Sequence, residues 1–143
     1  MYTEPIRRVM KRRQLLVAAP HTTVRKASMM MASRHVGAIL VVEGHQLLGI
    51  FTERDAVFRV VACGLEPDAT PLAAVMTAAP HTVSSGQSFG YGMLVMQQHG
   101  FRHLPVVDDG KLVGIVSSRN ALDPDLDEFN FEARRRAHLQ HAG

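Results

Sequence analysis

The pattern of apolar and polar positions along the chain occurs twice. Near-continuous apolar runs rich in β-branched residues cover residues 38–42, 47–51, 104–107 and 112–116. The runs are paired around short polar turns, which is typical of β-hairpins. Apolar residues at helical spacing precede each hairpin, over residues 22–34 and 88–99. The pattern therefore predicts two copies of a unit with the order helix, strand, helix, strand, strand, helix.

The two copies also match residue by residue. Residues 5–10 return 66 positions later as residues 71–76, and residues 41–52 return 65 positions later as residues 106–117. A unit of about 60 residues is too small to bury a full core alone, so we expect the copies to pack on each other. The predicted organisation is repeat 1 over 5–64, a linker over 65–70, repeat 2 over 71–122 and a helical tail over 123–143.

Three glycines, at positions 86, 90 and 92, stand within or just before the first helix of the second copy. Interior glycines weaken a helix by roughly 0.5–1 kcal/mol each. Alternatively, they permit close backbone approach between helices. Both interpretations remain open from the sequence.

Charge is distributed unevenly along the chain. The net charge is +3, but residues 1–65 hold ten Lys/Arg against four Asp/Glu, and five of the ten lie between Arg7 and Arg13. This basic group indicates either a surface for nucleic acid or an acidic partner, or the solvated face of a short helix. We favour the solvated face, because no aromatic residue is interleaved for base stacking.

The composition excludes several classes of protein. The single cysteine, Cys63, cannot form an internal disulfide, and the apolar residues 15–19 are too few for a signal peptide. No stretch approaches the roughly 20 apolar residues of a membrane span. We therefore expect a cytoplasmic protein without a membrane segment. The histidines lack further partners for a three- or four-ligand metal site, and Cys63 lacks a base, so we predict neither metal nor catalysis.

In both copies a strand ends in a hydroxyl residue and a helix follows. Thr52 and Ser117 stand where a hydroxyl and the free N–H groups of a helix start can bind phosphate. Asp55, three residues after Thr52, offers two acceptor oxygens to a ribose diol. The same spacing also matches a capping box, in which Asp55 would bond to the backbone of Thr52. From the residues alone, both interpretations stay open.

The segments from Gly49 to Asp55 and from Gly114 to Asn120, each after a Val-Val-acid hairpin turn, resemble the closing motif of the CBS domain, the cystathionine β-synthase type. The Val-Met pairs and residues 100–107 are also similar to that family, so the resemblance covers residues 5 to about 122. It implies a CBS pair, or Bateman module: an α+β fold of two βαββα repeats packed sheet to sheet about a pseudo-twofold axis. In this family, clefts between the repeats commonly hold adenosine-type ligands, and modules usually dimerise.

The resemblance implies which residues bind the ligand, and the copies differ there. Asp55 corresponds to Asn120, which keeps one acceptor but loses the charge. Near the phosphates, repeat 2 has Arg102-His103 where repeat 1 has Gly37-Ala38. We expect the Asp55 cleft to bind a nucleoside and the Asn120 cleft a phosphate-rich or weaker ligand. The candidate binding residues are Gly37, Ala38, Thr52, Arg54, Asp55, Thr77, Arg102, His103, Ser117, Arg119 and Asn120.

These features predict a regulatory, energy-sensing module that binds AMP, ADP or ATP and signals to a downstream protein by changing shape. S-adenosylmethionine and NAD are less favoured ligands. We expect a homodimer through its helices, no required cofactor and no enzymatic activity. The alternative is a non-catalytic scaffold or subunit that binds nucleic acid or an acidic partner through the basic N-terminal segment. The sequence does not identify the downstream protein.

Overall fold

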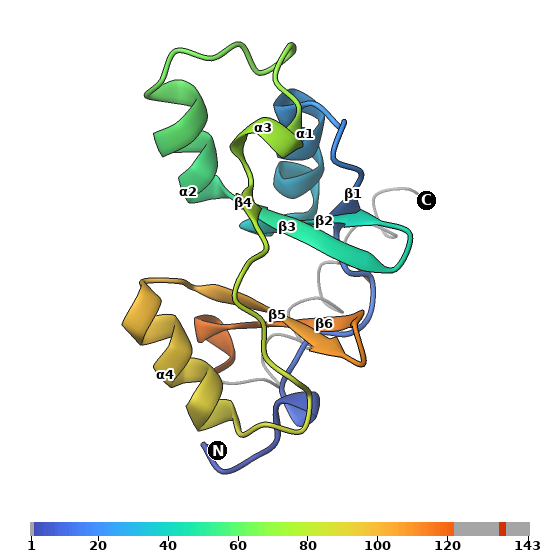
Figure 1. The fold of residues 1–143 in the computed structure, drawn as a ribbon, viewed down its shortest axis with the longest axis vertical. Helices are drawn as coiled ribbons and strands as arrows, with labels where there is room; N and C mark the ends of the chain where they lie inside the picture. Colours follow the sequence, from blue (N-terminus) through green and yellow to red (C-terminus); the bar gives the residue numbers. More distant parts are fainter. Residues whose placement is uncertain (1, 122–134, 137–143) are drawn as a thin grey trace.

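The computed structural model describes residues 2–121 and 135–136 of the chain, which form two stacked repeats (Figure 1). The strands of the first repeat are β1 (Val17–Ala18), β2 (Ala38–Glu43), β3 (Gln46–Thr52) and β4 (Thr77–Ala78), in that order across one sheet. Its helices are α1 (Val24–Arg34), α2 (Glu53–Asp55), which continues into the π-helical turns η2 (Ala56–Val61), and α3 (Leu72–Val75). The second repeat contains the hairpin β5 (His103–Asp108) and β6 (Lys111–Ser117), helix α4 (Phe89–His99), and the 3-10 turns η1 (Ile6–Arg8) and η3 (Ser118–Ala121).

The long helices begin at the residues that the sequence indicates. The Thr23 hydroxyl accepts a hydrogen bond from the Lys26 N–H (3.2 Å), and the Ser88 hydroxyl accepts one from the Tyr91 N–H (3.1 Å). Each thereby satisfies one of the free N–H groups of a first helical turn. Both helices end at a residue with left-handed backbone, which in α4 is Gly100 with φ 71°. The two long predicted helices, α1 and α4, and both predicted hairpins are therefore confirmed.

Several short elements differ from the expectation. The first predicted helix is only the 3-10 turn η1, because Lys11 already pairs with Ile115 at the edge of the second sheet and must be extended. The short first strand expected in the second copy is reduced to a single bridge between Val83 and Val106. The closing helix of the second repeat is the 3-10 turn η3, whereas that of the first continues as η2.

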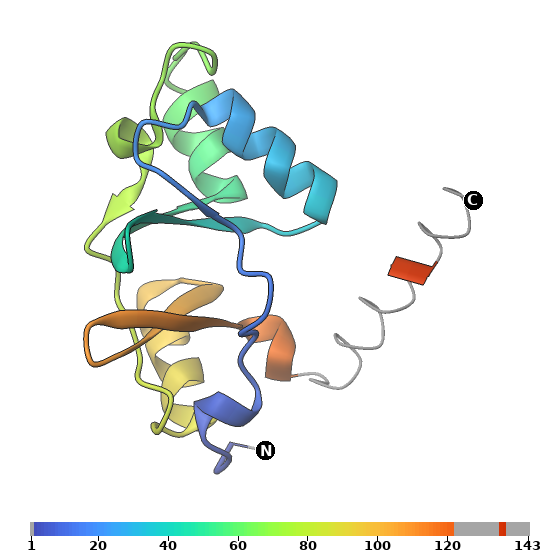
Figure 2. The same ribbon diagram turned by 90° about the vertical axis from the view of Figure 1, so that its right-hand side faces the viewer.

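Each repeat is completed by the short helix with which the other repeat begins in sequence. Ile6 of η1 is fully buried in one core with Phe89 and other second-repeat residues. Leu72 of α3 is fully buried with Phe51 and other first-repeat residues. The N-terminal segment accordingly lies beside the second repeat in both views (Figures 1 and 2). The two cores thus depend on an exchange of chain segments between repeats.

Gly90 and Gly92 serve this exchange. A Cβ added to Gly90 would lie 3.1 Å from the Tyr2 carbonyl oxygen, and the Gly90 N–H donates to that oxygen at 2.9 Å. At Gly92 an added Cβ would lie 3.4 Å from Cδ1 of Ile6. The N-terminal segment therefore approaches α4 closely, through the Tyr2 backbone at Gly90 and through the Ile6 side chain at Gly92, rather than by contact between two helix backbones.

The two sheets face each other, and the long helices cover their outer sides (Figures 1 and 2). Ala38, Leu40 and Ile50 are buried between the sheets, against Leu112 and Ile115 of β6. The two hairpins also share one irregularity, a register shift at Val41/Val42 and at Val106/Val107. The predicted α+β fold of two related repeats, packed sheet to sheet with pseudo-twofold symmetry, is confirmed.

Two further predictions concern the C-terminal tail and membrane-spanning helices. The helical tail predicted over 123–143 lies outside the described residues, apart from Arg135 and Arg136, which are helical and exposed. Among the described residues, no helix combines the length and the apolar character needed to cross a membrane.

Candidate functional site

The strand ends that carry most of the predicted site residues lie at one edge of the stacked sheets, which we call the seam. In the first repeat, Ala38 at the start of β2 is paired with Thr52 at the end of β3. In the second, His103 at the start of β5 is paired with Ser117 at the end of β6. Strand pairing alone therefore brings each hydroxyl residue next to the position where the copies differ in charge.

The start of α2 in the first repeat touches the second repeat at the seam. The Arg54 guanidinium Nη1 donates to the Gly100 carbonyl oxygen at 3.4 Å, three residues before His103. The same guanidinium lies 5.5 Å from the centre of the Phe58 ring. Residues of both repeats thus meet at the seam.

His103 is half-buried at the seam, and its charge is controlled by several neighbours. Burial lowers the pKa of its imidazole, the Glu53 carboxylate raises it, and the charges of Arg119 and Arg102 lower it. The net result is a lowered pKa, so the imidazole is neutral near pH 7. A neutral imidazole can donate one hydrogen bond and accept another.

Thr52 and Asp55 form a capping box at the start of α2. The Thr52 N–H donates to Asp55 Oδ2 at 3.0 Å, and the Asp55 N–H donates to the Thr52 hydroxyl oxygen at 3.2 Å. The other carboxylate oxygen of Asp55 lies 3.5 Å from Nε of Arg59, which itself bonds to the Met76 carbonyl oxygen. The capping interpretation is confirmed, and the role of Asp55 toward a ribose stays a prediction.

Ser117 and Asn120 repeat one of the two hydrogen bonds of this capping box. The Ser117 N–H donates to Asn120 Oδ1 at 2.8 Å, and the Ser117 hydroxyl donates to the same oxygen at 3.2 Å. Asn120 is only 7% exposed, whereas the Asp55 side chain is 14% exposed and carries an ion pair. The Asn120 side chain therefore accepts the same backbone hydrogen bond as Asp55 does but carries no charge.

The remaining predicted residues lie around the same seam. Thr77 on β4 is paired with Ile50, two residues before Thr52 on β3, and is half-buried. Arg102 and Arg119 are exposed. Glu53 is a seam residue that the sequence reasoning did not select. The signal for it was an acidic residue in the first copy where the second copy has Ser118.

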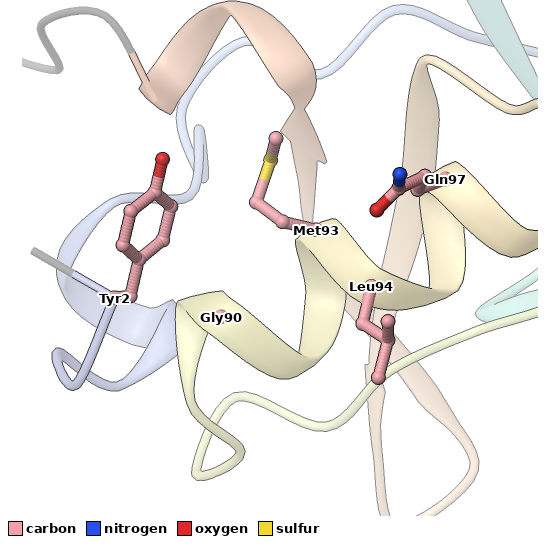
Figure 3. Close-up of a pocket in the computed structure, with 5 residues that line it drawn as sticks. All are labelled: Tyr2, Gly90, Met93, Leu94 and Gln97. Atoms are coloured by element: carbon pink, nitrogen blue, oxygen red, sulfur yellow. The ribbon is translucent and has the colours of Figure 1, made fainter.

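An open hollow lies elsewhere, on the outer side of the second repeat (Figure 3). It measures about 440 Å³ and is lined by Tyr2, Gly90, Met93, Leu94 and Gln97. None of these residues carries a charge, so the hollow offers nothing to balance a phosphate. The charged seam is the better candidate for an anionic ligand.

Metal binding has little support in the described part of the chain. His81 and His99 stack with their ring centroids 4.1 Å apart, and Phe101 lies beside both. Within residues 2–121 and 135–136, however, no group of three His, Cys, Asp or Glu side chains is placed to hold a metal ion.

Two equivalent repeats with a charged seam between them define a paired-repeat protein, and comparison with known proteins identifies the family. The sequence model of the CBS domain matches residues 6–62 and 72–124, so the chain belongs to the CBS domain family and carries two copies. It is 36% identical over 104 residues to the CBS domain-containing protein YhcV of Bacillus subtilis, covering 73% of this chain and 74% of YhcV.

Other relatives extend this comparison. The chain is 40% identical over 102 residues to a CBS domain-containing protein of Arabidopsis thaliana, a match that covers 71% of this chain but only 18% of that protein. A solved structure of a CBS domain protein from Pyrobaculum aerophilum, complexed with AMP, superposes with a TM-score of 0.75 at 26% identity. This superposition covers 82% of the present chain and 89% of the other.

Proposed function

We propose that this protein is a regulatory module that binds adenine nucleotides at the seam between its repeats and signals to a partner protein by a change of shape. The observation that carries the proposal is the meeting of Arg54 with Gly100 at the seam, which links the ligand-binding positions of the two repeats. The CBS domain protein of the same fold that holds AMP supports adenosine-type ligands.

The two repeats contribute different chemical groups to ligand binding. Thr52 and Ser117 place hydroxyls and backbone N–H groups at helix starts, which suits phosphate or ribose oxygens. Arg102 and Arg119 supply positive charge for phosphate. Asp55 supplies acceptor oxygens for a ribose in the cleft of the first repeat. The nucleoside is expected in the Asp55 cleft, with AMP, ADP or ATP as the ligand.

A change of shape has a physical route in this fold. The Asp55 carboxylate holds the start of α2 and also the side chain of Arg59, which bonds to the chain just before β4. A ligand hydroxyl that engages Asp55 competes with these contacts. It thereby alters the segment that connects the two repeats, which is a differential contact of the kind that shifts populations.

We further propose that the module is a homodimer formed through its helices. Apolar side chains are exposed on η2 and on α4, among them Phe58 (61%), Val61 (72%) and Leu94 (48%). Exposed apolar groups of this size on neighbouring elements indicate an interaction surface. Self-association would cover them.

A thermal-shift experiment with AMP, ADP, ATP, S-adenosylmethionine and NAD tests the proposed ligand class. A true ligand raises the melting temperature in step with its concentration, because it stabilises the folded state by RT ln(1 + [L]/Kd). No shift with any of these compounds would contradict the proposal. An electrophoretic gel shift with DNA that weakens steeply with salt would instead favour the basic N-terminal segment as the functional surface.

A further inference from the structure

At the seam, equivalent positions of the two repeats carry a long charged residue and a small residue in opposite order. The Glu53 carboxylate lies over Gly37, where an added Cβ would meet Oε1 at 3.0 Å. The second repeat reverses the pair, with the small Ser118 at the helix start and the long Arg102 on the strand side. The same backbone hydrogen bond occurs in both pairs. The Glu53 N–H donates to the Gly37 carbonyl oxygen, and the Ser118 N–H donates to the Arg102 carbonyl oxygen, each at 3.0 Å.

The reversal places opposite charges on the two sides of the seam. Around His103 stand Glu53 from the first repeat and the seam arginines, Arg102 and Arg119, from the second. Burial lowers the pKa of His103, whereas the Glu53 charge raises it and the seam arginines lower it, so all three charges act at this point. The start of α2 is also hydrogen-bonded to the segment just before β5. The segment that carries Glu53 is therefore held against the segment just before β5.

We propose that Glu53 determines how much phosphate charge the seam accepts. Its carboxylate offsets the seam arginines and repels a bound ligand more strongly with each added phosphate. This role rests on the proposed nucleotide-binding function. For charges about 8 Å apart in water-like surroundings, each added negative charge changes binding roughly two- to three-fold. Glu53 therefore weakens the preference that the two seam arginines give to a triphosphate over a monophosphate.

Calorimetric titration of AMP, ADP and ATP into the full chain and its Glu53→Gln variant tests the proposal. Loss of the Glu53 charge should strengthen ATP binding roughly five-fold more than AMP binding, with ADP between them. Higher salt should reduce the difference. The matched control is Glu43→Gln, which removes the same charge from the exposed end of β2, opposite to the seam. It should change all three affinities equally and by less than about two-fold.

A second measurement reports on Glu53 without any nucleotide. In the Glu53→Gln variant, the pKa of His103, followed by NMR, should fall further, because the charge that raises it is gone. An unchanged His103 titration, or equal effects of Glu53→Gln on all three nucleotides, would overturn the selectivity role alone. Absence of binding by every nucleotide to the wild-type chain would overturn the proposed function and the selectivity role together.

Discussion

Met10 lies against the backbone of Gly114, so that the segment with which the first repeat begins closes the sheet of the second. A Cβ at position 114 would stand 2.7 Å from Met10 Sδ and 2.8 Å from the Lys11 carbonyl oxygen. The same relationship joins Met76 to Gly49 in the first repeat. The glycine of each closing motif is thus required by the segment that crosses it.

Gly114→Ala is expected to destabilise the protein by about 1–3 kcal/mol, as overpacking does in cores. The Met10 side chain can move, but the Lys11 backbone is held by its pairing with Ile115. Chemical denaturation measures the free energy of unfolding. Gly86→Ala is the control, because its added Cβ would meet only Arg7, at 4.0 Å, and should cost less than about 0.5 kcal/mol. Equal stability of the two variants would contradict the close packing.

Ile6→Ala should damage the second repeat although position 6 belongs to the first repeat in sequence. Ile6 is fully buried in the second-repeat core, so truncation should cost about 2–5 kcal/mol. Amide hydrogen exchange should become faster in β5 and β6 before it does in β2 and β3. Leu72→Ala is the reciprocal variant and should first loosen the strands of the first repeat. If Ile6→Ala instead accelerated amide hydrogen exchange first in β2 and β3, the swap of segments between the repeats would be refuted.

His103 should make the fold less stable in mild acid. Its pKa is lowered in the folded protein from the ordinary 6.5, mainly by burial, so the unfolded chain binds the proton more readily. Stability is therefore lost as pH falls below about 6.5, until the folded-state pKa is passed. His103→Gln should flatten this part of the curve of unfolding free energy against pH. A variant curve with the same slope as the wild type would exclude His103 as the cause.

Val61→Glu should separate a dimer into monomers of 15.7 kDa. The Val61 side chain is 72% exposed on η2, so a charge there should leave the fold intact but disfavour burial in an interface. Light scattering after gel filtration gives the mass. Met29→Glu, on the exposed face of α1, is the matched control and should keep the dimer. A monomeric wild-type chain would contradict the proposed assembly at once.

Regular periodicity allowed most of the fold to be predicted. The hairpins follow from near-continuous apolar runs and polar turns, and α1 and α4 follow from their apolar spacing and from the caps Thr23 and Ser88. The exchange of η1 and α3 could not be predicted, because residues 5–10 and 71–76 share the same pattern of proline, apolar residue, valine and methionine. Either copy of such a motif fits either core, and only tertiary contacts decide which core it joins.

The position of the site could be predicted from the sequence better than the roles of its residues. The matching motifs located Thr52, Asp55, Ser117 and Asn120 at strand ends, and pairing across the strands brought them to the seam. The spacing of Thr52 and Asp55 fits a cap and a ribose contact equally well, since both need an acceptor at the same place. The importance of Glu53 depends on its closeness to His103, which no local pattern reveals.

The most direct test of nucleotide binding at the seam is an NMR titration of the ¹⁵N-labelled chain with AMP. The account predicts shifts of amide signals in two separate segments, residues 52–55 of the first repeat and residues 100–103 of the second. The hairpin turns at 44–45 and 109–110, at the other ends of the strands, should remain unchanged. Saturating AMP that leaves both seam segments unperturbed, or that shifts only the basic residues 7–13, would contradict it.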